Sequence, residues 1–344
     1  MKNNSDIRNI LVLTFLFLLS IIPLGFLTDA SRDTFAYAPL PNTDYASPDL
    51  DLEYEALENM ADYILVESDI AEYSPEREIP EGSTAESLLD SILEEYGLNE
   101  ENFSFFYRNT FTQEIYMYNP DTLFTAASTV KVPVNMLYYD AVNSGERTQE
   151  DGLPYNASAT DTEGDGSTPY DCRPGSLVPL SYLMEESIVY SDNTANNIMI
   201  QNLGGVSAYR HMMLKYSDNT YPDAFFASNK LCADFSFDVI NYLYEHSSAY
   251  TPLLEYMKEA APGTFLQKYI DLDLFPVAHK YGDYDGCLHD YGIVYTPAPF
   301  LIGVFTDHVS NAEDLIGVIG ETYLNYTLSV AEPTYVRISV VPAS

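Results

Sequence analysis

Three short motifs, far apart along the chain, most constrain how this sequence can fold. They are Ser128-Thr129-Val130-Lys131, Ser191-Asp192-Asn193 and Lys280-Tyr281-Gly282. Together they supply two serine hydroxyls, two lysine amines and a side-chain amide. A serine hydroxyl is a poor nucleophile at neutral pH, so it works only beside a base and beside donors for an oxyanion. If these groups form one site, the fold must bring three distant segments to the same place.

The spacing within the first motif predicts that the Lys131 amine faces the Ser128 hydroxyl, because helical positions three apart share a face. A serine at a helix N-terminus gains a favourable dipole and keeps its backbone N–H free for an oxyanion. Pro133 is consistent with a helix start close by, since proline is tolerated in a first turn. Lys131 can act as a base only if burial or a nearby cation lowers its pKa. Lys280 is the candidate for that cation.

Each motif taken alone has an ordinary structural explanation. Ser-x-x-Lys occurs as a pair on helix surfaces, and Ser-Asp-Asn is common in turns and caps. A lone Lys280 would be a surface lysine at a strand end. The ordered set and its context favour the functional interpretation, because an apolar stretch at 123–127 precedes the first motif and a predicted strand at 277–280 carries the third.

In order and spacing, the motifs resemble those of the penicillin-recognising serine hydrolases, that is, the class A β-lactamases and the related D,D-peptidases. The resemblance covers about residues 83 to 330. It implies an α/β domain with an antiparallel sheet flanked by helices, and an all-helical lobe, about residues 132–270, inserted in the sheet domain. It implies no cofactor and no metal ion, and no C-x-x-C pair or His/Cys cluster indicates zinc.

The resemblance also implies roles for the first two motifs. Ser128 is expected to be the nucleophile and Lys131 its base. Ser191 would relay a proton toward the leaving nitrogen, and Asn193 would hold Lys131 and the substrate's amide. Asp192 would be mainly structural.

In the third motif, Lys280 is expected to add positive potential that attracts a substrate carboxylate. Tyr281, Gly282 and Asp283 would line the substrate and oxyanion side, with the backbone N–H of Asp283 as the second oxyanion donor. Tyr281 departs from the commonest family form, Lys-Thr-Gly. No arginine follows Lys280 until Arg337, so a guanidinium partner for the carboxylate is not visible in the sequence.

A second departure concerns deacylation. Class A β-lactamases carry a glutamate in an omega loop, which activates the water that hydrolyses the acyl-enzyme. Here the segment 216–230 contains only Asp218 and Asp223 as acids and no Glu-x-x-x-Asn pattern. We therefore expect acylation without fast turnover. Asp223 is either a substitute base or, as the ordinary alternative, a solvated loop acid.

Several functions remain open from the sequence. The first is a β-lactamase-type hydrolase that forms an acyl-enzyme on Ser128. The second is a D-Ala-D-Ala carboxypeptidase-like enzyme acting on peptidoglycan stem peptides. The third is a non-catalytic cell-wall binding module, motivated by Tyr281 and the missing glutamate. A Ser-His-Asp hydrolase has little support, because there is no G-x-S-x-G elbow and His279 and His289 are better explained as structural or rim residues.

The N-terminal region indicates export. An apolar run at 10–27 follows two basic residues, and Ala36-Tyr37-Ala38 fits a cleavage site, with Thr28-Asp29-Ala30 as a weaker rival. An uncleaved membrane anchor is the alternative, because the run almost reaches spanning length. We expect residues 1–38 to be an export signal or a membrane tether, and the enzyme to work extracellularly or on the outer face of the cytoplasmic membrane.

Composition and charge indicate a linker, argue against nucleic-acid partners and limit the number of disulfides. Residues 39–82 carry thirteen Asp or Glu and one basic residue, which is typical of a solvated linker ahead of a domain at 83–344. The net charge of −37 argues against DNA or RNA as a partner, because binding phosphates needs clustered Lys and Arg. Cys172, Cys232 and Cys287 allow at most one disulfide.

Local patterns place the secondary structure of the domain. Ser83-Thr84-Ala85-Glu86 matches a capping box, and Gly97 ends the helix that it begins. The segment 156–176 is rich in Gly, Ser, Thr and Asp and should be a surface loop. Further helices are expected at 180–186, at 235–246 and after 310, and strands at 103–107, 114–118, 277–280, 287–295 and 300–306.

Overall fold

The computed structural model of the protein describes residues 78–163 and 166–330. The chain divides into two units, residues 1–73 and 74–344, and all described residues belong to the second. The expected export signal or anchor, nearly all of the expected linker and the segment after residue 330 lie outside the described residues. Within the described ranges, no helix is both long enough and apolar enough to cross a membrane.

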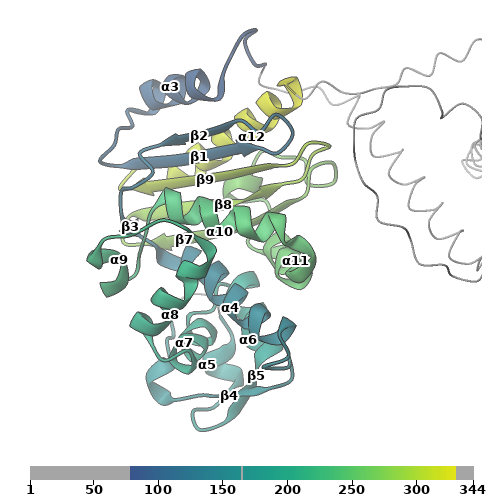
Figure 1. Ribbon diagram of the computed structural model, residues 1–344. Coiled ribbons are helices and arrows are strands. Elements are labelled where there is room, and N and C mark those ends of the chain that lie inside the picture. The colour runs from purple at the N-terminus through teal and green to yellow at the C-terminus, as the bar shows by residue number, and fades with distance from the viewer. Residues whose placement is uncertain (1–77, 164–165, 331–344) are drawn as a thin grey trace, which may run out of the picture. The chain divides into compact units, whose positions relative to one another are not determined.

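A five-stranded antiparallel sheet forms the centre of the domain (Figure 1). Its strand order is β2-β1-β9-β8-β7, so that strands from before and after the helical segment share one sheet. The strands are β1 (Phe103–Asn109), β2 (Ile115–Tyr118), β7 (Val277–Tyr284), β8 (Cys287–Val294) and β9 (Phe300–Asp307). The strand expected at 277–280 continues to Tyr284, because the whole third motif pairs with β8. The predicted fold class is confirmed.

Helices cover both faces of this sheet, and neighbouring aromatic residues of β1 show how. Successive side chains of a strand point to opposite faces. Phe105 packs on Tyr323 of α12 (Ala312–Val330), with ring centroids 4.7 Å apart. Phe106 packs on Phe237 of α10 (Ala233–Glu245) at 5.5 Å. The sheet is thus a middle layer, and α10 lies within the range expected for the helical lobe but packs on the sheet.

The first helix, α3 (Ala85–Tyr96), begins one residue later than its capping box predicted. Thr84 is the N-cap, and the box is closed by Ser87, whose hydroxyl accepts from the Thr84 backbone N–H at 2.9 Å. The Ser83 hydroxyl instead donates to the Pro80 carbonyl at 2.7 Å and does not cap the helix. Gly97 ends the helix in the left-handed conformation, as predicted (φ 66°).

The remaining elements form the helical lobe and its connections. Helix α4 (Lys131–Asn143) runs through the core, and Val132, Val134 and Met136 are fully buried. The other helices and helical turns are η1 (Ala127–Val130), η2 (Ala157–Ala159), α5 (Thr168–Asp171), α6 (Leu180–Val189), α7 (Asn193–Asn202), α8 (Val206–Met212), η3 (Met213–Tyr216), α9 (Asp223–Ala227), η4 (Ser247–Ala249), α11 (Thr251–Glu259) and η5 (Phe265–Gln267). Two short strand pairs join β3 (Phe124–Thr125) to β6 (Lys230–Leu231) and β4 (Gly152–Pro154) to β5 (Leu177–Pro179).

Candidate active site

Ser128 lies in the 3-10 turn η1, immediately before α4, and not inside an α-helix as the motif spacing was interpreted. Residues three apart are also aligned in a 3-10 turn, so Lys131 still lies on the same face as Ser128. The Lys131 Nζ lies 2.9 Å from the Ser128 Oγ. The hydroxyl is partly exposed, whereas the amine is buried. The structure therefore brings the first two predicted residues into hydrogen-bonding contact at the edge of the core.

The Lys131 amine is surrounded by neutral oxygen atoms. Besides Ser128, it contacts the Ser191 carbonyl at 2.5 Å, the Ser191 Oγ at 3.2 Å and the Asn193 Oδ1 at 2.8 Å. Among residues 78–163 and 166–330, no carboxylate hydrogen-bonds to this amine. Burial lowers the pKa of Lys131 to about 7, and the more distant charges of Asp192 and Asp161 oppose that shift. An amine with this pKa spends much of its time as a neutral base at physiological pH.

The second motif turns sharply between α6 and α7. Ser191 adopts a left-handed backbone (φ 54°), which points both its carbonyl and its hydroxyl at Lys131. Asp192 is buried and caps α7, because its Oδ1 accepts the Ala195 backbone N–H at 2.9 Å. Its other oxygen accepts the Thr168 N–H at 2.7 Å. The structural role expected for Asp192 matches these contacts.

The segment 156–176 is more than the surface loop that its composition indicated. It contains η2 and α5, and Thr168 is fully buried. Besides the Asp192 contact, the Thr194 hydroxyl donates to the Asp161 carbonyl at 2.7 Å. Backbone groups of the segment, the Thr168 N–H and the Asp161 carbonyl, bind it to the Asp192 and Thr194 side chains.

Lys280 comes from strand β7 and meets the same serine from the opposite side. Its Nζ lies 3.0 Å from the Ser191 Oγ and 3.1 Å from the Tyr281 carbonyl. Complete burial, and then the charge of Lys131, hold the pKa of Lys280 well below its usual range. The Ser191 hydroxyl thus contacts both lysine amines and can exchange a proton with either.

Gly282 allows β7 to lie directly against the nucleophile turn. A Cβ at this position would be 2.8 Å from the Ser128 backbone nitrogen and 3.0 Å from the Ala126 carbonyl oxygen. Asp283 follows on the same strand and is exposed. The strand is therefore in place beside Ser128, and the use of the Asp283 N–H as an oxyanion donor stays a prediction.

A buried arginine supports the turn from the other side, and no sequence motif marked it. The Arg210 Nη2 donates to Asn229 Oδ1 at 2.9 Å, and its Nη1 donates to the Lys230 carbonyl. Asn229 in turn donates from Nδ2 to the Ala127 carbonyl at 3.1 Å, and its own carbonyl accepts the Ala126 N–H at 2.9 Å. Arg210 therefore fixes the loop that holds the residues just before Ser128.

The two acids of the loop at 217–230 are exposed and do not contact the reacting groups. Asp223 begins α9 and is exposed, and Asp218 is exposed as well. Neither hydrogen-bonds to Ser128 or Lys131. This placement is the one expected of solvated loop acids, and it gives Asp223 no contact from which to act as a base.

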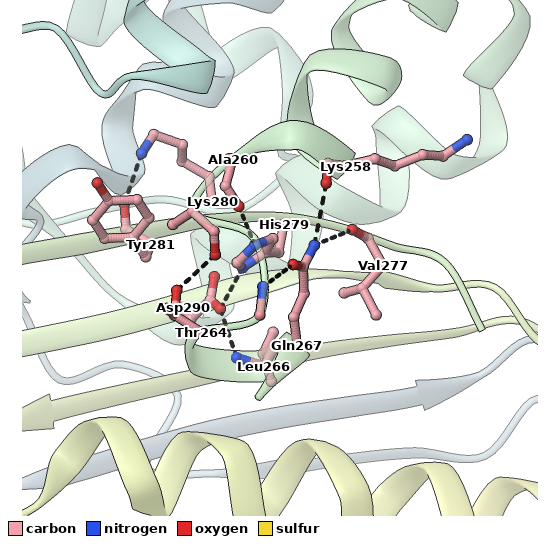
Figure 2. Close-up of polar contacts among 12 residues, drawn as sticks. Lys258, Ala260, Thr264, Leu266, Gln267, Val277, His279, Lys280, Tyr281 and Asp290 are labelled. Atoms are coloured by element: carbon pink, nitrogen blue, oxygen red, sulfur yellow. Dashed lines mark hydrogen bonds and ion pairs between the residues drawn. The ribbon is translucent and has the colours of Figure 1, made fainter. Parts of the chain in front are cut away.

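The two histidines near the third motif are buried within the sheet. His279 Nδ1 lies 2.6 Å from Asp290 Oδ2, and its Nε2 lies 2.7 Å from the Ala260 carbonyl (Figure 2). His289 Nε2 lies 2.8 Å from the Thr125 carbonyl. Their contacts are structural, and neither is a rim residue.

The cysteines and possible metal ligands add no further chemistry to the site. Cys172, Cys232 and Cys287 are all unpaired, so no disulfide forms among them. In the part of the chain that the structure describes, no group of three His, Cys, Asp or Glu side chains is placed to hold a metal ion.

Comparisons with known proteins identify the family and the fold. Residues 84–327 match the model of the beta-lactamase enzyme family. Among solved structures, PBP-A superposes with a TM-score of 0.61 at 21% identity, covering 74% of this chain and 98% of that chain. A beta-lactamase from Sphaerobacter thermophilus DSM 20745 gives a TM-score of 0.61 at 22% identity, covering 72% and 99%. A point mutant of PBP-A, solved as an acyl-enzyme complex with penicillin-G, gives 0.61 at 20%, covering 75% and 99%. No protein with a curated description matches.

Proposed function

This chain belongs to the beta-lactamase enzyme family of serine hydrolases, and we propose that it forms a slowly hydrolysed acyl-enzyme with β-lactams on Ser128. The observation that carries the proposal is the contact between the Lys131 Nζ and the Ser128 Oγ, at 2.9 Å, with the pKa of Lys131 lowered to about 7. A neutral amine at this distance can accept the hydroxyl proton as the oxygen attacks a carbonyl.

The acylation step uses the described groups in sequence. The Ser128 oxygen bonds to the lactam carbonyl carbon, and its proton passes to Lys131. Backbone N–H groups of Ser128 and Asp283 stabilise the oxyanion. The C–N bond then breaks, and the leaving nitrogen takes a proton from Ser191, which regains one from Lys131 across a separation of 3.2 Å. The product is an ester on Ser128 with every proton accounted for.

Deacylation is proposed to be slow because it needs a second base that prepares a water molecule. Among the described residues, the acids of the loop at 217–230 are exposed and make no contact with Ser128 or Lys131. A water that attacks the ester without general-base assistance forfeits the 10²–10⁴-fold typical of that assistance.

Intact mass spectrometry with benzylpenicillin tests the proposal, because it follows acylation and deacylation in one time course. We expect a stoichiometric adduct that persists for minutes or longer on the wild-type protein. Ser128→Ala should give none. A wild-type protein that gains no mass and does not consume the drug contradicts the proposal and favours a non-catalytic binding module. Rapid drug consumption without a detectable adduct contradicts slow deacylation but is compatible with acylation of Ser128.

A D-Ala-D-Ala carboxypeptidase activity is the second candidate, favoured by the same absence of an acid contact at Lys131 among the described residues. An enzyme of this kind cleaves a peptidoglycan stem peptide and is trapped by penicillin. Release of D-alanine from a D-Ala-D-Ala pentapeptide, blocked by prior acylation with benzylpenicillin, supports this candidate. No release at enzyme concentrations that give full acylation argues against it.

We also propose that the enzyme works outside the cytoplasmic membrane, with the N-terminal region as signal or tether. The support is the sequence pattern of residues 1–38, with its apolar run and A-x-A site. Fractionation of cells expressing the full chain, followed by N-terminal sequencing, distinguishes release after Ala38 from an uncleaved anchor. Recovery of the intact chain in the cytoplasm contradicts the proposal.

A further inference from the structure

The ring of Tyr281 covers the amine that was expected to attract a substrate carboxylate. The Lys280 Nζ lies 4.0 Å from the centroid of this ring, well inside the range of a cation–π contact (Figure 2). The other contacts of the amine are the Ser191 hydroxyl and the Tyr281 carbonyl. Lys280 is completely buried and the Tyr281 ring beside it is partly exposed, so an incoming carboxylate meets the ring and not the Lys280 nitrogen.

Phe265 holds the Tyr281 ring in this position. The two rings are stacked, with centroids 4.7 Å apart and an interplanar angle of 13°. Both side chains are partly exposed, so the stacked pair forms part of the surface beside the reacting groups. A stacked aromatic pair contributes about 0.5–1.5 kcal/mol beyond the area that it buries. The position of the Tyr281 ring is therefore stabilised from the side away from Lys280.

The backbone beneath Phe265 is built to keep it there. Phe265 has a left-handed conformation (φ 51°), which costs a residue with a side chain on the order of 1 kcal/mol. Asp290 compensates, because its Oδ2 accepts the Leu266 N–H at 3.0 Å. The next residue, Gln267, also binds the sheet, because its Nε2 donates to the Val277 carbonyl at 3.0 Å (Figure 2). The segment is thus bound to the sheet through the two residues that directly follow Phe265.

The charge of the site also disfavours binding of a substrate carboxylate. Burial and the neighbouring Lys131 lower the pKa of Lys280, so its amine carries less positive charge than an ordinary lysine. The chain as a whole has a net charge of −37, which repels anions at long range. Of the other cationic side chains, Arg210 is fully buried and its donors are used by the loop that it supports.

We propose that Tyr281 and Phe265 form an aromatic wall that selects substrates carrying an uncharged, apolar or aromatic group beside the scissile amide, where a free carboxylate would otherwise bind. The inference rests on the proposed acyl-enzyme function of Ser128 and specifies its substrate class. Tyr281 is the specificity-determining residue, and Phe265 positions its ring.

Benzylpenicillin and its methyl ester provide the test, because they share the reactive ring and differ by one negative charge. Acylation rate constants are measured for both by intact mass in the wild type, in Tyr281→Thr and in Tyr284→Thr. Tyr284 is a matched control on the same strand that is 58% exposed and outside the wall. We expect the wild type to react with the ester at least as fast as with the acid. In Tyr281→Thr, the acid-to-ester ratio should rise tenfold or more, and in Tyr284→Thr it should equal the wild-type ratio.

Three results overturn the inference, and they can be told apart. A wild-type preference of tenfold or more for the free acid contradicts the aromatic wall while leaving the acyl-enzyme intact. A ratio unchanged by Tyr281→Thr does the same, provided that circular dichroism shows a folded variant. If that variant does not fold, Phe265→Leu removes the stacking ring and should shift the ratio in the same direction by a smaller factor, and no shift overturns the inference. Absence of adducts from both compounds refutes the proposed function itself.

Discussion

The two halves of the site treat their lysines differently. In the helical half, Lys131 is surrounded by oxygen atoms of Ser128, Ser191 and Asn193, all within 3.2 Å. In the sheet half, the Lys280 amine contacts two oxygen atoms and the face of the Tyr281 ring among the described residues. The first half is a hydrogen-bonded centre that can move protons. The second half is partly apolar. We therefore assign the chemistry of the site to the first half and its selectivity to the second.

Removing the amine of the helical half gives the largest expected effect. Lys131→Met keeps the length and burial of the side chain but leaves no base for the Ser128 proton, and acylation by benzylpenicillin should fall by about 10²–10⁴-fold. Single-turnover mass spectrometry measures the loss. Asn143→Ala, an exposed change at the far end of α4, serves as the matched control. A Lys131→Met enzyme that acylates at the wild-type rate shows that another group is the base.

The pH dependence of the acylation rate tests the role of Lys131 in the helical half. Lys131 is a base only when neutral, and with its pKa near 7 the neutral fraction falls about tenfold for each pH unit below that value. Acylation should therefore be about 100-fold slower at pH 5 than on its plateau above pH 8. The rate–pH profile checks this. A flat profile from pH 5 to 8 rules out Lys131 as the titrating base.

Adding one methyl group tests how closely the two halves must meet. Gly282→Ala places a Cβ 2.8 Å from the Ser128 nitrogen, so β7 or η1 has to shift. Overpacking of this kind costs about 1–3 kcal/mol, and we expect a comparable loss of unfolding free energy in urea, with slower acylation. Gly286→Ala, in the adjoining hairpin and outside the site, should destabilise the fold without altering the rate per folded molecule. Equal effects of both changes on the rate would show that the approach of β7 to Ser128 is not critical.

The smallest expected effect lies outside both halves. Thr84→Ala removes the N-cap hydroxyl of α3 and should cost about 1 kcal/mol of unfolding free energy. The acylation rate should not change, because α3 supplies no group to the site. Urea unfolding and single-turnover acylation on the same preparation make the comparison. A change in the acylation rate would contradict this expectation, because it would show that α3 influences the site.

Local sequence patterns predicted much of this arrangement, with errors where two local choices were equally good. The helix at 85–96 was expected, but Ser83 and Thr84 are both able to cap it. The choice depended on the Pro80 carbonyl, which accepts the Ser83 hydroxyl. The segment 156–176 looked like a solvated loop, because composition does not reveal that Asp192 and Thr194 bind it.

What the sequence determined by itself is that Ser128 and Lys131 share one face, since positions three apart are aligned in a 3-10 turn. The meeting of Lys280 with Ser191, the stacking of Phe265 on Tyr281 and the support of Asn229 by Arg210 were decided by the tertiary structure alone. Each joins side chains from different elements, and their approach depends on how the sheet and helices pack. No short-range pattern encodes that packing.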